Sequence, residues 1–228
     1  SASALVLAVV SLGIAWMIGG RHLVHEIKDN DSISLSAEGG GIAARTTRTL
    51  DFDPATPLTI EAPVELTFTR GDAPALTVEG PTKLIGAMRW EGGRLFLDKQ
   101  APASRGSLSV RITAPQLPSL NIKGPGQIEL RDLRQPTLAL TIAGAANVEG
   151  KGKVDNLAID ASGAGNLDLE NLEAGDAKVN IAGLGNVDLS VTGKLDAAIA
   201  GAGSVTLHRK PQVIDTRITG IGSIEHDY

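Results

Sequence analysis

The sequence predicts an all-β protein whose single globular domain is a parallel β-solenoid, or β-helix, with coils of 19 to 20 residues. Three observations lead to this prediction. A glycine-containing segment recurs six times in the second half of the chain, apolar residues alternate with small or polar ones on both sides of each copy, and helical periodicity is absent. Repeats at a fixed period complete a core only by stacking on their neighbours.

Each copy begins with a glycine, and successive leading glycines are 20, 19, 20, 18 and 19 residues apart. A variable residue, a second glycine or an alanine, a polar residue and an aliphatic residue follow. We expect each copy to form a tight corner between two strands, because glycine tolerates the positive φ angles that other residues avoid. The leading glycines are Gly124, Gly144, Gly163, Gly183, Gly201 and Gly220.

Two columns of mostly aliphatic residues define the expected core. Their spacing is that of strands with one buried face, and in a parallel stack equivalent residues would lie about 4.8 Å apart. Two positions before the leading glycines stand Ile122, Ile142, Ala161, Ile181, Ile199 and Ile218. Four positions after them stand Ile128, Val148, Leu167, Val187, Val205 and Ile224.

An apolar run, Ala2–Gly20, precedes the solenoid. As a helix it would extend about 28 Å, close to the hydrocarbon thickness of a bilayer at about 30 Å. We expect residues 1–20 to be one N-terminal transmembrane helix, a retained signal anchor; a cleaved signal peptide is the main alternative. The anchoring residues would be Leu5, Leu7, Val10, Leu12, Ile14, Trp16 and Ile18.

Residues 21–48 are predicted to be a juxtamembrane linker, because Glu26–Asp31 is highly charged and Gly39–Gly41 breaks any periodic pattern. Within it, Ser32–Ser36 has the alternation of a short strand that either pairs with the body or stays alone. The solenoid domain, residues 49–228, divides into irregular capping coils at 49–118 and regular repeats at 119–228.

The capping coils are predicted to contain a β-hairpin. Trp90–Arg94 includes two glycines and lies between Leu84–Met88 and Leu95–Leu97, which we interpret as the two strands. A hairpin with bulky residues would cover the sheet edge at this end of the solenoid. The opposite end, Ser223–Tyr228, shows no such cover, so charge or a partner would be needed there.

The repeated unit and the order of the upstream strands resemble the head GIN domain, a family of autotransporter-adhesin-like proteins of bacterial envelopes. The upstream segments in the family's order are Leu58–Ile60, Val64–Asp72, Leu76–Gly80, Gly93–Leu97 and Val110–Pro115. The resemblance covers roughly residues 50–228. It implies an extracytoplasmic β-helical module without established enzymatic activity, and it brings no catalytic residues.

Composition limits the classes of function. The chain has a net charge of −5, 3% aromatic residues and no cysteine, so we expect no disulfide, no thiol nucleophile and no acylated lipoprotein anchor. A mildly acidic chain with few aromatic residues is a poor nucleic-acid binder, because it has little with which to neutralise phosphates or stack on bases. We expect no nucleic-acid partner, no cofactor and no catalytic residues.

One outward column is acidic. Carboxylates about 4.8 Å apart repel by roughly 0.9 kcal/mol even in water, so such a column requires raised pKa values, interleaved basic side chains or bound cations. A solvated structural ladder is the favoured interpretation, and weak cation binding is the alternative. The candidate residues are Glu129, Glu149, Asp168 and Asp188.

Two further sets of polar residues are assigned ordinary roles. The asparagine column Asn147, Asn166 and Asn186 is expected to satisfy backbone groups at the corners. The four histidines are His22, His25, His208 and His226. None has a ligand-spaced histidine or an acidic partner in the sequence, so neither a metal site nor a catalytic triad is predicted.

A column of small residues directly before the leading glycines is the candidate interaction face. Small residues permit close approach by another surface, whereas a merely solvated face usually carries Lys, Glu and Arg. Tight stacking of coils would favour small residues equally well. The column contains Ala143, Ser162, Ala182, Ala200 and Thr219.

Together these features predict a non-enzymatic, membrane-anchored, extracytoplasmic module that binds in the manner of an adhesin. Its partners would be membrane lipid, through the N-terminal helix, and a protein or glycan ligand. The alternative is a scaffold subunit that packs its helix and solenoid against an integral membrane complex. We expect a bacterial envelope location, with an inner-membrane anchor and the solenoid in the periplasm.

Overall fold

The computed structural model describes residues 33–36, 44–101 and 106–228. Throughout these residues the chain is built almost entirely from strands, which form a solenoid of about five turns. The predicted anchor at residues 1–20 lies outside the described residues. Among those described, no helix has the length and apolar character needed to span a bilayer.

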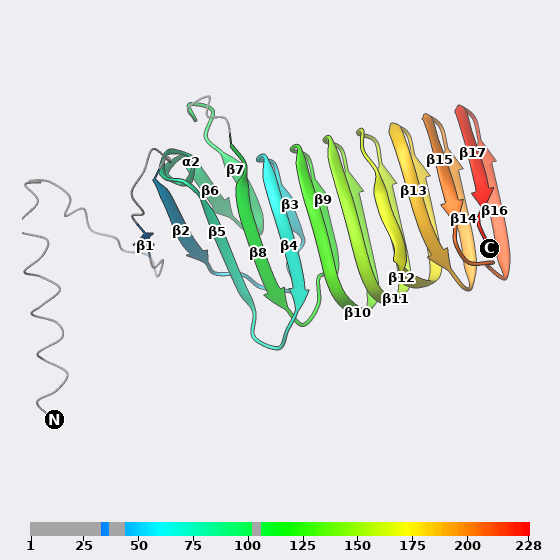
Figure 1. Cartoon of the computed structure of the whole chain (residues 1–228), viewed down its shortest axis with the longest axis horizontal. Coiled ribbons are helices and arrows are strands. Elements are labelled where there is room, and N and C mark those ends of the chain that lie inside the picture. The colour runs from blue at the N-terminus through cyan, green and yellow to red at the C-terminus, as the bar shows by residue number, and fades with distance from the viewer. Residues whose placement is uncertain (1–32, 37–43, 102–105) are drawn as a thin grey trace, which may run out of the picture. The chain divides into compact units, whose positions relative to one another are not determined.

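The regular half is a stack of parallel coils (Figure 1). Its strands are β9 (Ser119–Ile122), β10 (Gly126–Ile142), β11 (Ala146–Ala161), β12 (Leu167–Ile181), β13 (Leu184–Val191), β14 (Lys194–Ile199), β15 (Ala202–Leu207), β16 (Val213–Ile218) and β17 (Ile221–His226). β10 and β11 each bend through nearly a complete coil, whereas the last coils are divided into two strands. We call the sheet that precedes the glycine corners the pre-corner sheet and the sheet that follows them the post-corner sheet.

The pairing register confirms the predicted core columns. In the pre-corner sheet Ile142 lies opposite Ala161, which in turn lies opposite Ile181. In the post-corner sheet Val148 lies opposite Leu167 and Leu167 opposite Val187. All of these except the half-buried Ala161 are buried, because the alternation of each strand turns one side chain in two toward the interior.

The capping half mixes parallel and antiparallel strands. Its elements are β1 (Ile33–Ser36), β2 (Arg45–Leu50), β3 (Leu58–Ile60), β4 (Val64–Arg70), β5 (Ala75–Pro81), α2 (Thr82–Ala87), β6 (Met88–Glu91), β7 (Arg94–Leu97) and β8 (Leu108–Ala114). β4 continues the solenoid by pairing in parallel with β10 and β8, while β5 runs antiparallel to β8 and β2. β1 pairs antiparallel with β2, so the short strand expected near residue 33 does join the body.

The predicted hairpin is present, but one of its expected strands is wrong. β6 and β7 pair antiparallel around Gly92 and Gly93, whose φ angles are +53° and +81°. The segment interpreted as the first strand, Leu84–Met88, is instead mostly the short helix α2. Leu84 and Ile85 are adjacent and both buried, which a strand would not allow because it turns neighbouring side chains to opposite faces.

The two ends of the solenoid differ as expected. One end of the solenoid is formed by the capping half, with α2 and the antiparallel strands. The other end is formed by the last coil, which consists of β16 and β17 (Figure 1). Ile218 of β16 is 45% exposed, although it occupies the position at which Ile199 of the coil before is 1% exposed. The inward residues of the last coil therefore lack a covering layer within the described chain.

Candidate interaction surfaces

The five residues of the candidate interaction face are all exposed, at the edge where the pre-corner sheet turns into the post-corner sheet. Their backbone continues the ladder, since the N–H of Ser162 donates to Ile142 O at 2.9 Å and that of Ala182 to Ala161 O at 2.8 Å. The side chains therefore project from the corner between the two sheets.

A second column, directly after the leading glycines, runs along the same corner. Most of its members are exposed, and it contains Pro125, Ala145, Ala164, Leu184, Ala202 and Ile221. Leu184 is 63% exposed and Ile221 is 86% exposed. We call the two columns from Ala143 to Ile221 the corner ridge. It carries small and aliphatic side chains and no charged one.

The leading glycines are required by close approach of the coils. A Cβ atom at Gly163 would overlap the carbonyl oxygen of Gly144, and one at Gly183 would overlap that of Gly163. Positive φ angles occur two residues later, at Gly165 and Gly185. The positive φ expected of glycine at the corners therefore applies to the second glycine of these copies and not to the first.

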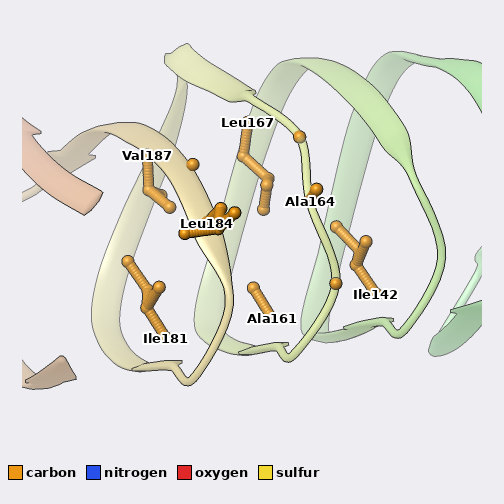
Figure 2. Close-up of a pocket in the computed structure, with 10 residues that line it drawn as sticks. Ile142, Ala161, Ala164, Leu167, Ile181, Leu184 and Val187 are labelled. Atoms are coloured by element: carbon orange, nitrogen blue, oxygen red, sulfur yellow. The ribbon is translucent and has the colours of Figure 1, made fainter. Parts of the chain in front are cut away.

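A small void lies under the ridge (Figure 2). Ala161 occupies a position at which the neighbouring coils have isoleucine, and the missing carbon atoms leave about 10 Å³ beside Ile181 and Leu184. The lining is apolar, so the void offers no hydrogen-bond partners to a water molecule or a polar ligand. It is a packing defect and not a binding site.

The carboxylate column exists as predicted and is interleaved with basic side chains. Glu129 lies opposite Glu149, and Glu149 lies opposite Asp168. Arg131 Nε donates to Glu129 Oε1 at 2.5 Å, and Lys151 Nζ lies 2.7 Å from Glu149 Oε1. The bond from Arg131 lowers the pKa of Glu129, and the bond to Glu149 raises the pKa of Lys151.

These partners offset the repulsion between Glu129 and Glu149. No group of three or more acidic or histidine side chains among the described residues has a geometry that could hold a metal ion. Two further carboxylates, Asp168 and Asp188, continue the column in register. The arrangement supports the structural ladder, and the cation-binding alternative stays a prediction.

His208 has acidic neighbours that sequence reasoning missed. Its Nε2 atom lies 3.7 Å from Asp188 Oδ1 and 4.0 Å from Glu170 Oε2, and its Nδ1 atom lies 3.4 Å from Asp227 Oδ2. The expectation that no acidic partner accompanies this histidine is therefore wrong. The three carboxylates come from other coils, so only the stacking register brings them together.

The asparagine column satisfies corner groups, as predicted. Asn147 Oδ1 accepts a hydrogen bond from the backbone N–H of Asn166 at 3.1 Å, and Asn166 Oδ1 accepts one from that of Asn186 at 3.3 Å. Asn186 Oδ1 then accepts from Ser204 Oγ at 2.9 Å. Each side chain thus ties its coil to the next.

Comparison with known proteins identifies relatives of this architecture. The family described as "Putative auto-transporter adhesin, head GIN domain" matches residues 56–211. A crystal structure of a "putative adhesin" from Bacteroides fragilis NCTC 9343 superposes with a TM-score of 0.66 at 20% identity, over 80% of this chain and 96% of that one. Another "putative adhesin", from Parabacteroides distasonis ATCC 8503, has a TM-score of 0.46 at 16% identity over 80% and 96% of the two chains. No curated protein matches the sequence.

Proposed function

The chain belongs to the head GIN domain family of auto-transporter adhesin-like proteins, and we propose that it is a non-enzymatic binding module that contacts a protein partner through its corner ridge. Membership of this family implies a protein of the bacterial envelope or surface, and the solenoid fold points to a binding role. We further propose that residues 1–20 anchor the chain in the inner membrane and that the solenoid lies in the periplasm.

The exposed aliphatic residues of the ridge carry the proposal. An exposed leucine or isoleucine alone is ordinary, but here Leu184 and Ile221 stand among alanines along one corner with no charged side chain between them. Small neighbours leave the ridge smooth, so a partner surface can approach the backbone closely. Elsewhere the outer columns carry carboxylates, lysines and arginines.

The chemistry of the ridge favours a protein over a glycan. Sugar rings are commonly held by aromatic platforms and by hydrogen-bonding side chains, whereas a protein interface has an apolar core. No aromatic residue lies on the ridge, and its only side-chain hydroxyls are those of Ser162 and Thr219. A protein is therefore the partner that fits the ridge best.

The test compares ridge variants of the full chain, purified in detergent and immobilised, for capture of bacterial envelope fragments. Leu184→Asp and Ala182→Arg should lower capture at least about tenfold, because charge and bulk hold a flat apolar partner away. Asp168→Arg, which places an arginine on the carboxylate column instead, should leave capture unchanged. Circular dichroism melts should show all three variants folded.

Pretreatment of the fragments separates the classes of partner. Protease treatment should abolish capture and glycosidase treatment should not. Capture that survives protease but is lost after glycosidase treatment would identify a glycan and overturn the protein assignment. Equal capture by all variants would remove the ridge from the binding site, and extraction of the chain as a large stable membrane complex would favour the scaffold role.

A further inference from the structure

The last coil presents a sheet edge and an apolar surface together. Among the described residues β16 pairs only with β14, and β17 pairs only with β15. The outer edge of each strand therefore carries backbone N–H and C=O groups that no described strand pairs. Ile214 occupies the position at which Leu195 is fully buried, yet it is 40% exposed.

We propose that a second copy of this chain covers this end, in a two-fold dimer in which β16 of each copy pairs antiparallel with β17 of the other. The free edge of the last coil follows a helical path around the solenoid. A rotation by 180° about an axis perpendicular to the solenoid leaves the handedness of this path unchanged. Two identical last coils therefore fit each other along their length, and the contact closes without leaving a new edge. The axis passes through the corner, where Thr219 faces the same residue of the second copy.

This pairing matches the inward and outward faces of the two strands. With Thr219 on the axis, Ile214 lies opposite Ile224 of the second copy, and both are inward positions, aligned with Leu195 and Val205 of the coil before. The apolar interior then continues from one solenoid into the next. Because strand side chains alternate, a shift of the register by one residue would place inward residues against outward ones.

Charges along the edge are also self-complementary. The edge begins with Arg209 and Lys210 and ends with Glu225 and Asp227. Antiparallel pairing places the basic start of one copy beside the acidic end of the other, twice in each dimer. An alternative dimer with β16 against β16 fails on geometry, because it would bring the two β17 strands into the same layer.

The dimer also joins the corner ridges of the two copies, whatever partner the ridge binds. Because the axis passes through the corner, the ridges of the two copies meet at Thr219 and form one longer strip. Two linked binding surfaces raise the effective affinity for a partner that repeats along a surface.

Cysteine cross-linking tests the axis directly. The chain has no cysteine, so in a single-cysteine variant any disulfide joins two molecules. In the full chain purified in detergent, Thr219→Cys should form a disulfide dimer on mild oxidation. Ala182→Cys, at the equivalent exposed corner position of an inner coil, should not. Equal cross-linking of both variants would overturn the proposed axis.

Sedimentation of the same detergent-solubilised chain tests the interface. The unmodified chain should be dimeric, and Ile214→Asp should raise the dissociation constant at least about a hundredfold by placing charge in the joined interior. Leu184→Asp, a ridge variant, should leave dimerisation unchanged. The two measurements therefore distinguish failure of the proposed partner binding through the ridge from failure of the proposed dimer. A monomer at all concentrations, or a dimer indifferent to Ile214→Asp, would overturn the inference.

Discussion

At the scale of single residues, the leading glycines show that stacking can restrict a position more than backbone conformation does. Gly163 and Gly183 are not in the left-handed region, yet a Cβ atom at either would overlap a carbonyl oxygen of the coil before. A backbone atom held by a neighbouring ladder cannot move aside as a flexible side chain can. The glycines are therefore fixed by the approach of neighbouring coils.

Gly183→Ala should consequently destabilise the solenoid by about 1–3 kcal/mol, the usual cost of forcing extra atoms into a packed site. Gly86→Ala is the matched control, because Gly86 lies in α2 and a Cβ atom added there would meet no atom within 4 Å apart from its chain neighbours and the backbone of its own helix. Alanine favours helix over glycine, so this control should keep or raise the melting temperature. Equal melting temperatures for the two variants would contradict the stacking explanation.

At Ala161, in contrast to Gly183, a larger side chain should stabilise the solenoid, since Ala161 leaves the void of about 10 Å³ beneath the corner. Ala161→Val should raise the free energy of unfolding by about 0.5–2 kcal/mol, because the added methyl groups bury apolar surface and restore contacts with Ile181. Ala143→Val adds the same atoms at an exposed ridge position and should change little. Denaturant titration of both variants decides; a destabilised Ala161→Val would show that the void is too narrow for the side chain.

At the scale of elements, an ion-pair cluster joins the capping half to the regular coils. Glu61, directly after β3, accepts a hydrogen bond from Arg94 of β7 at 2.5 Å and one from Lys123, directly after β9, at 2.9 Å. These bonds, with that from Arg94 the larger influence, lower the pKa of Glu61 from 4.5 to about 2. The hairpin is thus tied electrostatically to the first parallel coils.

The lowered pKa predicts how this tie depends on pH. Since the folded-state value lies below the ordinary one, the contribution of the Glu61 carboxylate to stability is complete above pH 4.5 and is lost as pH falls toward 2. Glu61→Gln should therefore melt below the unmodified chain at pH 7, with a gap that closes between those two values. Asp72→Asn, at an exposed turn after β4, should show no such gap at pH 7. A gap for Glu61→Gln that persists at pH 2 would rule out the ionised cluster.

In the whole molecule, the solenoid is a stack of equivalent layers. Its first and last layers each need something to cover their exposed sheet edges and inward residues. The capping half supplies β1, β2, β5 and α2 at one end, while the last coil exposes Ile214 and Ile218. A layered core also means that the described residues from Leu50 onward enclose one apolar interior. We therefore expect the body to fold without the predicted anchor at residues 1–20.

The separability predicts fractionation behaviour. The intact chain should stay with membranes through high-salt and alkaline carbonate washes, because a span of the length of Ala2–Gly20 matches a bilayer. Deletion of residues 1–20 should release a soluble protein with the same far-ultraviolet circular dichroism per folded residue. Release of the intact chain by carbonate would contradict the anchor, and an insoluble deletion variant would contradict the independence of the body.

The repeat, the parallel stacking and the inward columns from Ile122 to Val205 could be predicted from the sequence, because strand alternation and a fixed period are local properties. The helical conformation of Leu84 and Ile85 could not be predicted in this way, because it depends on the burial of both side chains in the folded cap. The tertiary structure also brought Asp188 to His208 and revealed why Gly163 must lack a side chain. Both contacts join residues in different coils, and they exist only once the register between coils is set.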